Sequence, residues 1–145
     1  MGTVLTNIHT VQWKPETNAR GQPWSSLDLS GEHLGVHLEA LPPGDRSSTH
    51  HYHTLEEEHV LILEGAATLV LGSEEISVSA GDHFWFPAGK EEAHHLENRS
   101  NANVKFLVFG ERCAGDVVVY PGNKVMLVKA LGWKQFTFDE RKKSQ

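Results

Sequence analysis

The sequence contains one cysteine, no long apolar run and few basic residues, and each shortage excludes a class of protein. Cys113 stands alone, so the chain cannot form an internal disulfide. Apolar runs such as 60–63 are far shorter than the roughly 20 residues that span a bilayer. Thirteen basic and nineteen acidic residues give a net charge of −6, which provides no broad positive surface for nucleic acid or an anionic membrane. No N-terminal stretch has the pattern of a secretion signal, and we therefore expect a cytoplasmic protein with neither of those partners.

Helical periodicity is also scarce, and the patterns that are present are those of short strands. Residues 33–40 alternate polar and apolar side chains, which is the period of a half-buried strand, and the prolines and glycine at 42–44 end it. Further strands are predicted at 60–63, 67–71, 75–78, 83–86, 93–96, 104–109 and 117–120. Many short strands with frequent turn residues are typical of an antiparallel sandwich or barrel, and in one small domain they indicate an all-β jelly roll.

The length of 145 residues and the change of pattern near residue 32 predict one domain with three regions. Residues 1–31 lack sustained periodicity and are predicted to form an N-terminal arm with at most one short strand. Residues 32–138 are predicted to form a β-barrel with a C-terminal extension. The charged residues 139–145 are predicted to be a tail.

The stretch 49–65, THHYHTLEEEHVLILEG, is rich in histidine and glutamate and leads directly into an apolar strand. Successive side chains of a strand alternate between its faces, so His51 and His53 point the same way. Glu58 shares its face with the apolar residues of the following strand, where an inward carboxylate is unfavourable unless it is paired or bound to a metal. Three such donors on adjacent strands are close to a complete metal site, which leaves a fourth donor to be found.

The stretch 81–98, GDHFWFPAGKEEAHHLEN, supplies candidates for the fourth donor. Turn residues at 81–82 and 87–89 enclose one short strand, and a second strand returns through His94 and His95. Because the two histidines are adjacent in a strand, one of them must face inward.

These two stretches resemble the two signature motifs of the cupin family. The first motif is matched by Gly44, His51, His53, Glu58 and Gly65. The second is matched by Gly81, Pro87, Gly89, His94 and Asn98. One residue more than the family pattern separates Gly44 from His51, and two more separate Gly89 from His94. Only His94 keeps the family spacing to Asn98, so the resemblance favours it as the fourth donor.

The resemblance implies a jelly-roll barrel, also called a double-stranded β-helix, and one bound divalent transition metal ion. Its ligands would be His51, His53, Glu58 and His94. Mixed imidazole and carboxylate ligation admits Fe, Mn, Ni, Co or Zn, and affinity order alone does not choose among them. Such a set leaves positions open for a small-molecule substrate. Small cupins often pair, and the N-terminal arm could add a strand to a neighbour's sheet edge, so we also expect a homodimer.

Three functions are compatible with such a site. The first is an enzyme in which the metal polarises the carbonyl of a sugar acid, sugar phosphate, keto acid or hydroxy acid, giving isomerase, lyase or decarboxylase chemistry. The second is an Fe(II)-dependent dioxygenase, and the third is a binder of small ligands without catalysis. The first requires a general base, for which Glu56, His37 and His83 are candidates by residue type.

Overall fold

The structure is a computed structural model that describes residues 2–17 and 23–139, so most of the predicted tail lies outside the described residues. Within them the chain forms strands and two short 3₁₀ helices, with no α-helix. The strands are β1 (Lys14–Thr17), β2 (Pro23–Asp28), β3 (Leu34–Leu41), β4 (Tyr52–His53), β5 (Glu58–Glu64), β6 (Ala66–Leu71), β7 (Glu74–Ser79), β8 (His83–Phe86), β9 (His94–Glu97), β10 (Val104–Glu111), β11 (Val117–Tyr120), β12 (Val125–Val128) and β13 (Lys134–Thr137). The 3₁₀ helices are η1 (Pro121–Asn123) and η2 (Lys129–Leu131). None of the described helices has the length and apolar character needed to cross a membrane.

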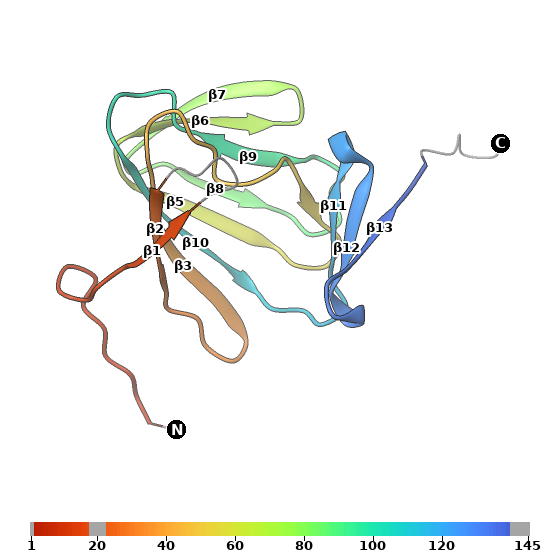
Figure 1. Cartoon of the computed structure of the whole chain (residues 1–145), viewed down its shortest axis with the longest axis horizontal. Helices are drawn as coiled ribbons and strands as arrows, with labels where there is room; N and C mark the ends of the chain where they lie inside the picture. The colour runs from red at the N-terminus through yellow and green to blue at the C-terminus, as the bar shows by residue number, and fades with distance from the viewer. Residues whose placement is uncertain (1, 18–22, 140–145) are drawn as a thin grey trace.

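The strands form three antiparallel sheets around one core, which confirms the predicted all-β jelly roll (Figure 1). The large sheet has the order β1-β2-β3-β10-β5-β8, and a smaller sheet of β7-β6-β9 closes the barrel against it. A C-terminal sheet of β13-β12-β11-β4 lies at one end of the barrel (Figure 1). The core between the first two sheets contains residues such as Ile62, Leu69, Leu96 and Phe106. Both sheets contribute to this cluster, so the barrel interior is one apolar unit.

The predicted N-terminal arm contributes two strands to the large sheet instead of at most one. β2 pairs with β3, with Leu27 opposite Leu38, and β1 pairs with β2 at the edge. β12 and β13, which extend the C-terminal sheet, also have no counterpart among the predicted strands. Of these four strands, β1 and β13 lie at sheet edges, whereas β2 and β12 each pair with two neighbours. Pairing with a neighbouring strand can hold a segment that lacks the alternating pattern of a half-buried strand.

The C-terminal half of β3 is buried on both of its faces. Leu41 belongs to the barrel core, whereas Leu38 points to the opposite face, and each is only 2% exposed. On the opposite face, Ile8 and Trp13 of the N-terminal segment line a cavity together with Leu38. The polar residues of β3 that alternate with Leu38, namely His37 and Glu39, therefore share the barrel side with Leu41.

Backbone hydrogen bonds bring the two sequence motifs together at one end of the barrel. His51 and His94 form an isolated antiparallel bridge, with N–H donors 2.9 and 3.3 Å from the partner's carbonyl oxygen. The Gly89 N–H donates to the His53 carbonyl oxygen at 2.9 Å. Gly89 has φ +77°, a left-handed conformation that glycine adopts without strain. The turn at Gly89 thus holds the second motif beside the first through a backbone hydrogen bond to His53.

Candidate metal centre

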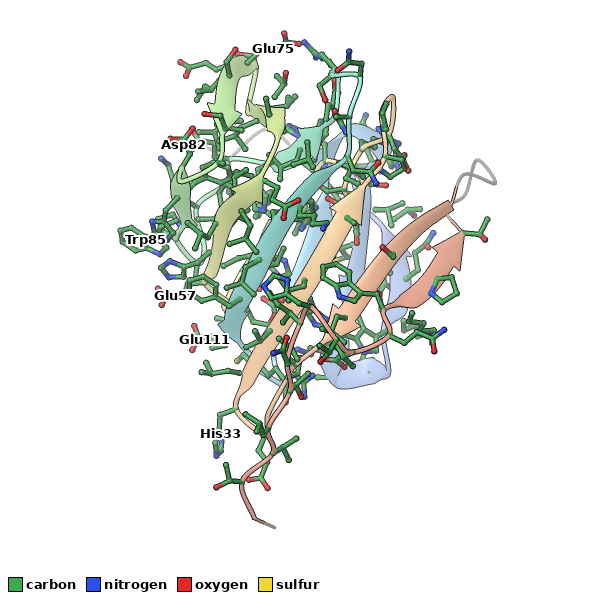
Figure 2. The ribbon with its side chains drawn as sticks, turned by 90° about the vertical axis from the view of Figure 1, so that its left-hand side faces the viewer. His33, Glu57, Glu75, Asp82, Trp85 and Glu111 are labelled. Atoms are coloured by element: carbon green, nitrogen blue, oxygen red, sulfur yellow. The ribbon has the colours of Figure 1, made fainter. Side chains whose placement is uncertain are left out.

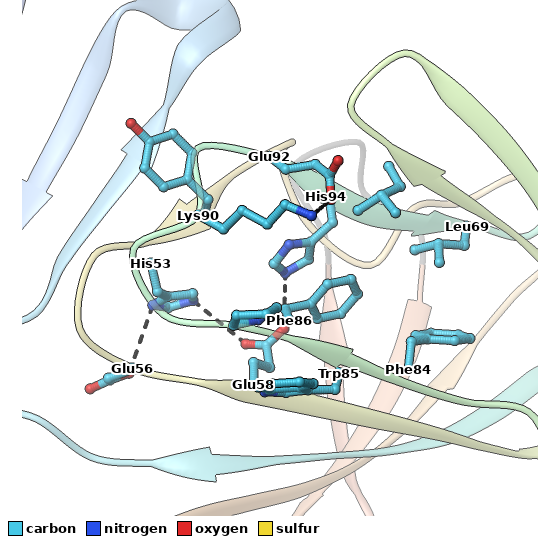
Figure 3. A pocket seen from close by; sticks show the side chains of 13 residues that line it. His53, Glu56, Glu58, Leu69, Phe84, Trp85, Phe86, Lys90, Glu92 and His94 are labelled. Atoms are coloured by element: carbon cyan, nitrogen blue, oxygen red, sulfur yellow. Dashed lines mark hydrogen bonds and ion pairs between the residues drawn. The ribbon is translucent and has the colours of Figure 1, made fainter.

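Three of the four predicted ligands offer donor atoms that lie within 4.8 Å of one another, namely His51, His53 and Glu58. The fourth, His94, places its Nε2 atom 3.2 Å from Oε1 of Glu58. The Nε2 atom of His53 lies 3.5 Å from Oε2 of the same carboxylate. Figure 3 shows His53 and His94 approaching Glu58 from two sides. The structure therefore gathers the three histidines around the Glu58 carboxylate.

Two of the histidines are oriented by hydrogen bonds at their outer nitrogen. Nδ1 of His51 lies 2.7 Å from the Thr49 carbonyl oxygen, which can only accept, so this nitrogen carries the hydrogen. Nδ1 of His53 donates to Oδ2 of Asp116 at 2.7 Å. An outer N–H that is held in this way fixes the tautomer and leaves the Nε2 lone pair for a metal. Both imidazoles are thus prepared as ligands.

Asp116 is a site residue that the sequence reasoning missed. Its side chain is fully buried, and its Oδ1 atom accepts hydrogen bonds from the backbone N–H groups of Leu55 at 2.9 Å and Glu56 at 3.3 Å. One carboxylate therefore holds both His53 and the loop that leads to Glu58. The available signal was a Gly-Asp pair in front of a predicted strand, which is typical of an ordinary turn.

His94 is held by stacking instead of by an outer hydrogen bond. Its ring lies parallel to that of Phe86, with 3.5 Å between the ring centroids and 3° between the planes. The His94 Nδ1 atom is buried and has no hydrogen-bond partner among the described residues. The adjacent His95 instead contacts His50, with 2.8 Å between the two Nδ1 atoms, and Glu97. Of the two adjacent histidines, His94 is the one that reaches Glu58.

The donor set fits a divalent transition metal by distance and by chemistry. Ligand atoms about 2.1 Å from one ion lie roughly 3.0–3.5 Å from each other, and the two nitrogen-to-oxygen distances at Glu58 fall in this range. Imidazole and carboxylate together suit Fe, Mn, Ni, Co and Zn. The Nδ1 atom of His94 has no hydrogen-bond partner among the described residues, so the orientation of this ring is set by its stacking on Phe86.

The electrostatics of the cluster favour a cation beside Glu58. Burial raises the pKa of Glu58, but hydrogen bonds from His53 and His94 outweigh it and hold this pKa far below its usual range. Burial lowers the pKa of His53, but hydrogen bonds to Glu58 and Asp116 outweigh it and raise the pKa to about 9. Burial and the neighbouring His94 lower the pKa of His51 to about 4. Without a metal the site thus holds a carboxylate, an imidazolium and a neutral imidazole.

The three candidate bases lie in different places. Glu56 lies at the site, but its Oε1 atom accepts from the Cys113 N–H at 2.8 Å and pairs with the Lys129 ammonium. His37 lines a wide cavity of about 620 Å³ that also reaches Glu56, and its Nδ1 is 3.7 Å from Asp28.

His83 is not brought to the site. It lies on the outer face of the large sheet, where its Nε2 is 3.0 Å from Nδ1 of His59. Trp85 is on the same strand and face, is 56% exposed, and donates from Nε1 to Glu57 at 3.2 Å. Figure 2 shows Trp85 and Glu57 on this outer side of the barrel.

Two further cavities border the cluster. One, of about 230 Å³, is bounded by His53, Glu58 and His94 and has apolar walls such as Leu69 and Phe84 (Figure 3). The other, of about 120 Å³, lies on the inner side, where His51, Glu58 and His94 meet the barrel core.

Glu39 of β3 lines the inner cavity and is the second residue that the sequence reasoning missed. Burial and the nearby Glu58 raise the pKa of Glu39 to about 7. The alternation in residues 33–40 pointed to Leu34, Val36 and Leu38 as the inward face. The inward face is instead that of Glu39 and Leu41. The face of Leu38 is covered by the N-terminal segment, which the strand's own pattern does not indicate.

An all-β barrel with histidines and a glutamate gathered at one end defines a class of small jelly-roll proteins with a candidate metal centre. Residues 37–110 match the family model of the cupin domain, Cupin_2, and this range is half of the chain. The chain therefore belongs to the cupin family, as the two motifs predicted.

Solved structures and a curated relative agree with this assignment. The chain is similar to a "Putative sugar phosphate isomerase" from Acidithiobacillus ferrooxidans, with a TM-score of 0.84 and 26% identity, covering 98% of this chain and 96% of that chain. It is also similar to a sugar phosphate isomerase of the cupin superfamily from Silicibacter pomeroyi, with a TM-score of 0.75 and 30% identity over 85% of each chain. The tetracenomycin polyketide synthase protein TcmJ of Streptomyces glaucescens is 31% identical over 77 residues, which are 53% of this chain and 48% of TcmJ. The chain thus spans about half the length of this curated relative.

Proposed function

We propose that this cupin is a metal-dependent enzyme that acts next to a carbonyl group of a small oxygenated substrate. The substrate class is a sugar phosphate, sugar acid, keto acid or hydroxy acid, and the reaction is an isomerisation, or else a lyase or decarboxylase reaction. One observation carries the proposal. The inner nitrogens of His53 and His94 meet the Glu58 carboxylate at the border of two cavities, while the outer nitrogen of His53 is already held by Asp116.

The cofactor would be one divalent transition metal ion, Fe, Mn, Ni, Co or Zn, held by His51, His53, Glu58 and His94. When bound, such an ion polarises a carbonyl and stabilises the negative charge that develops on its oxygen. A metal held by these four side chains would keep positions open for substrate, which suits a catalytic site better than a closed structural one.

The residues around the cluster support this function in two ways. Leu69, Phe84 and Phe86 form an apolar wall beside the ligands, which excludes water and strengthens the electrostatic interactions of the site. Glu56, which lines the same cavity, is paired with the Lys129 ammonium and so adds no uncompensated charge beside the ligands. The name of the Silicibacter pomeroyi protein, a sugar phosphate isomerase, favours the isomerase among the proposed reactions.

The proposal is tested by metal analysis and by exchange of substrate protons with solvent. We expect protein purified without added metal to contain about one transition metal ion per chain, and His51→Ala and Glu58→Ala to lose it. His33→Ala and Glu64→Ala, which change an exposed histidine and an exposed glutamate, are matched controls and should keep the metal.

The metal-loaded protein should then incorporate deuterium from D₂O into ribose 5-phosphate, glucose 6-phosphate or glucuronate without O₂, read by proton NMR. Equal metal content in parent and ligand variants would contradict the ligand assignment. Uptake of O₂ by the iron-loaded protein, with no deuterium exchange, would favour a dioxygenase instead. Thermal stabilisation by a ligand without turnover would indicate a binder.

A further inference from the structure

We infer that Glu39 is the group that removes and returns the substrate proton in the proposed reaction. This inference rests on the proposed function and assigns a residue to its missing step. Glu39 was not among the candidates that residue type and sequence position had suggested.

The position of Glu39 follows from the register of the large sheet. On β3 it lies opposite Phe106 of β10, a residue of the barrel core that is 1% exposed. It shares its face with Leu41, which belongs to the same core. Glu39 therefore points into the barrel, whereas Leu38 is buried on the opposite face of β3.

Inside the barrel, Glu39 borders the same cavity as three of the four proposed ligands. The cavity has a volume of about 120 Å³, and its lining includes His51, Glu58 and His94. The remaining wall is mainly apolar, with Phe86 and Phe106. A substrate end that reaches the ligands through this cavity would contact the Glu39 carboxyl group as well.

Glu39 differs from the other carboxylates of the site because no described residue holds its carboxyl group. Glu58 faces two histidines, Glu56 is bonded to Lys129 and a backbone N–H, and Asp116 is bonded to His53. Glu39 forms no hydrogen bond or ion pair with another described residue, although it is only partly exposed. An unpaired carboxyl group in such surroundings is unfavourable for folding and needs an explanation. A role as a general base provides this explanation, because a carboxylate that accepts a substrate proton must not be occupied by another partner.

The other candidates are less suited to this step. Glu56 is occupied by Lys129 and Cys113, and His83 lies on the outer face of the barrel. His37 borders the wide cavity that Glu58 also lines, but its side chain is 43% exposed and its Nδ1 atom lies 3.7 Å from Asp28. Among the described residues, Glu39 combines a free carboxyl group with a shared cavity at the ligands.

The proposed step is a proton transfer that needs no further reactant. The Glu39 carboxylate takes a proton from the hydroxyl-bearing carbon next to the substrate carbonyl. The electron pair of that C–H bond forms a carbon–carbon double bond, and the carbonyl electron pair moves onto its oxygen. Glu39 then returns the proton to the former carbonyl carbon, while the hydroxyl proton passes between the two substrate oxygens. The product is an isomer, so atoms and electrons balance.

The test compares Glu39→Gln with the parent in two measurements. Because the amide has the shape of the carboxyl group without its charge, we expect the metal-free variant to melt at a higher temperature than the parent at pH 8. We also expect unchanged metal content and a roughly 10²–10⁴-fold loss of deuterium exchange into ribose 5-phosphate, glucose 6-phosphate or glucuronate. Glu39→Asp should recover part of the exchange. Glu64→Gln, an exposed glutamate of β5, is the matched control and should change neither quantity.

Each result separates this inference from the proposed function. A stabilised Glu39→Gln variant that exchanges deuterium at the parent rate would overturn the role of Glu39 and leave the proposed function standing. A destabilised variant whose exchange falls only in proportion to its folded fraction would indicate a structural role and would also overturn it. A parent that binds metal and exchanges none of the three probes would overturn the proposed function, and with it the step assigned to Glu39.

Discussion

His53 and Asp116 lie 63 residues apart in the sequence and meet in a 2.7 Å hydrogen bond between Nδ1 and Oδ2. The bond connects a proposed ligand of the first motif to the segment that follows the barrel. β4 and β11 pair beside it, with Val118 opposite His53. The C-terminal sheet therefore contributes to the geometry of the candidate metal centre. Neither of the two cupin motifs includes this sheet.

Substitution of Asp116 by Asn should weaken metal binding. The Asn oxygen can still accept from the Leu55 N–H, but its NH₂ group would donate to Nδ1 of His53 and move the imidazole hydrogen to Nε2. We expect the affinity for Zn²⁺ to fall by about 10–100-fold. Asp28→Asn, which changes an exposed acid of β2, is the control. Equal Zn²⁺ affinity in parent and Asp116→Asn, measured by competition with a chelating dye, would show that the bond does not prepare His53.

Metal affinity should rise with pH up to about 9. The pKa of His53 is raised to about 9, so below this pH a bound metal must displace the proton from its Nε2 atom. We expect about a tenfold gain per pH unit between pH 7 and 9. His51, whose pKa is lowered to about 4, is already neutral in this range and adds no slope. Titration calorimetry with Zn²⁺ measures the slope, and a flat profile would contradict the assignment of His53 as a ligand.

Removal of the Glu39 charge should stabilise the metal-free protein in a pH-dependent way. The pKa of Glu39 is raised from 4.5 to about 7, so folding disfavours its ionised form. Below pH 4.5 the carboxyl group is protonated in both folded and unfolded chains, and Glu39→Gln should gain nothing from the lost charge. The gain should grow between pH 4.5 and 7 and reach about 2–3 kcal/mol above it. Urea unfolding at pH 4.5 and pH 8 measures the difference, and a gain that is equal at both values would rule out the charge as its cause.

Substitution of Gly110 by Ala should disturb both stability and metal binding. A β-carbon at Gly110 would lie 2.3 Å from the Glu57 carbonyl oxygen, so the backbone next to Glu58 must move. We expect a loss of about 1–3 kcal/mol in the free energy of unfolding and weaker Zn²⁺ binding. Gly122→Ala is the control, because no atom lies within 4 Å of the β-carbon that alanine would add there. A Gly110→Ala protein with unchanged melting temperature and unchanged Zn²⁺ affinity would refute this close packing.

The predicted fold and the clustering of the motif residues follow from local patterns in the sequence. Alternation, turn residues and the spacing of His51, His53 and Glu58 depend on neighbours along the chain, which a sequence displays directly. The homodimer, the cytoplasmic location and the bound metal itself stay predictions.

Glu39 and Asp116 could not be found in this way. The inward direction of Glu39 depends on the N-terminal segment that buries the other face of β3, and the partner of Asp116 is set by the pairing of β4 with β11. Contacts of this kind depend on how distant segments pack. The local pattern around a polar residue in an alternating strand or a turn does not indicate such packing.

The family match ends at residue 110, six positions before the carboxylate that holds His53. A fragment trimmed to the matched range would keep all four motif donors and lose the group that orients one of them. The range that matches the family model is therefore smaller than the unit that we expect to bind metal, and a transplanted barrel should include the last sheet.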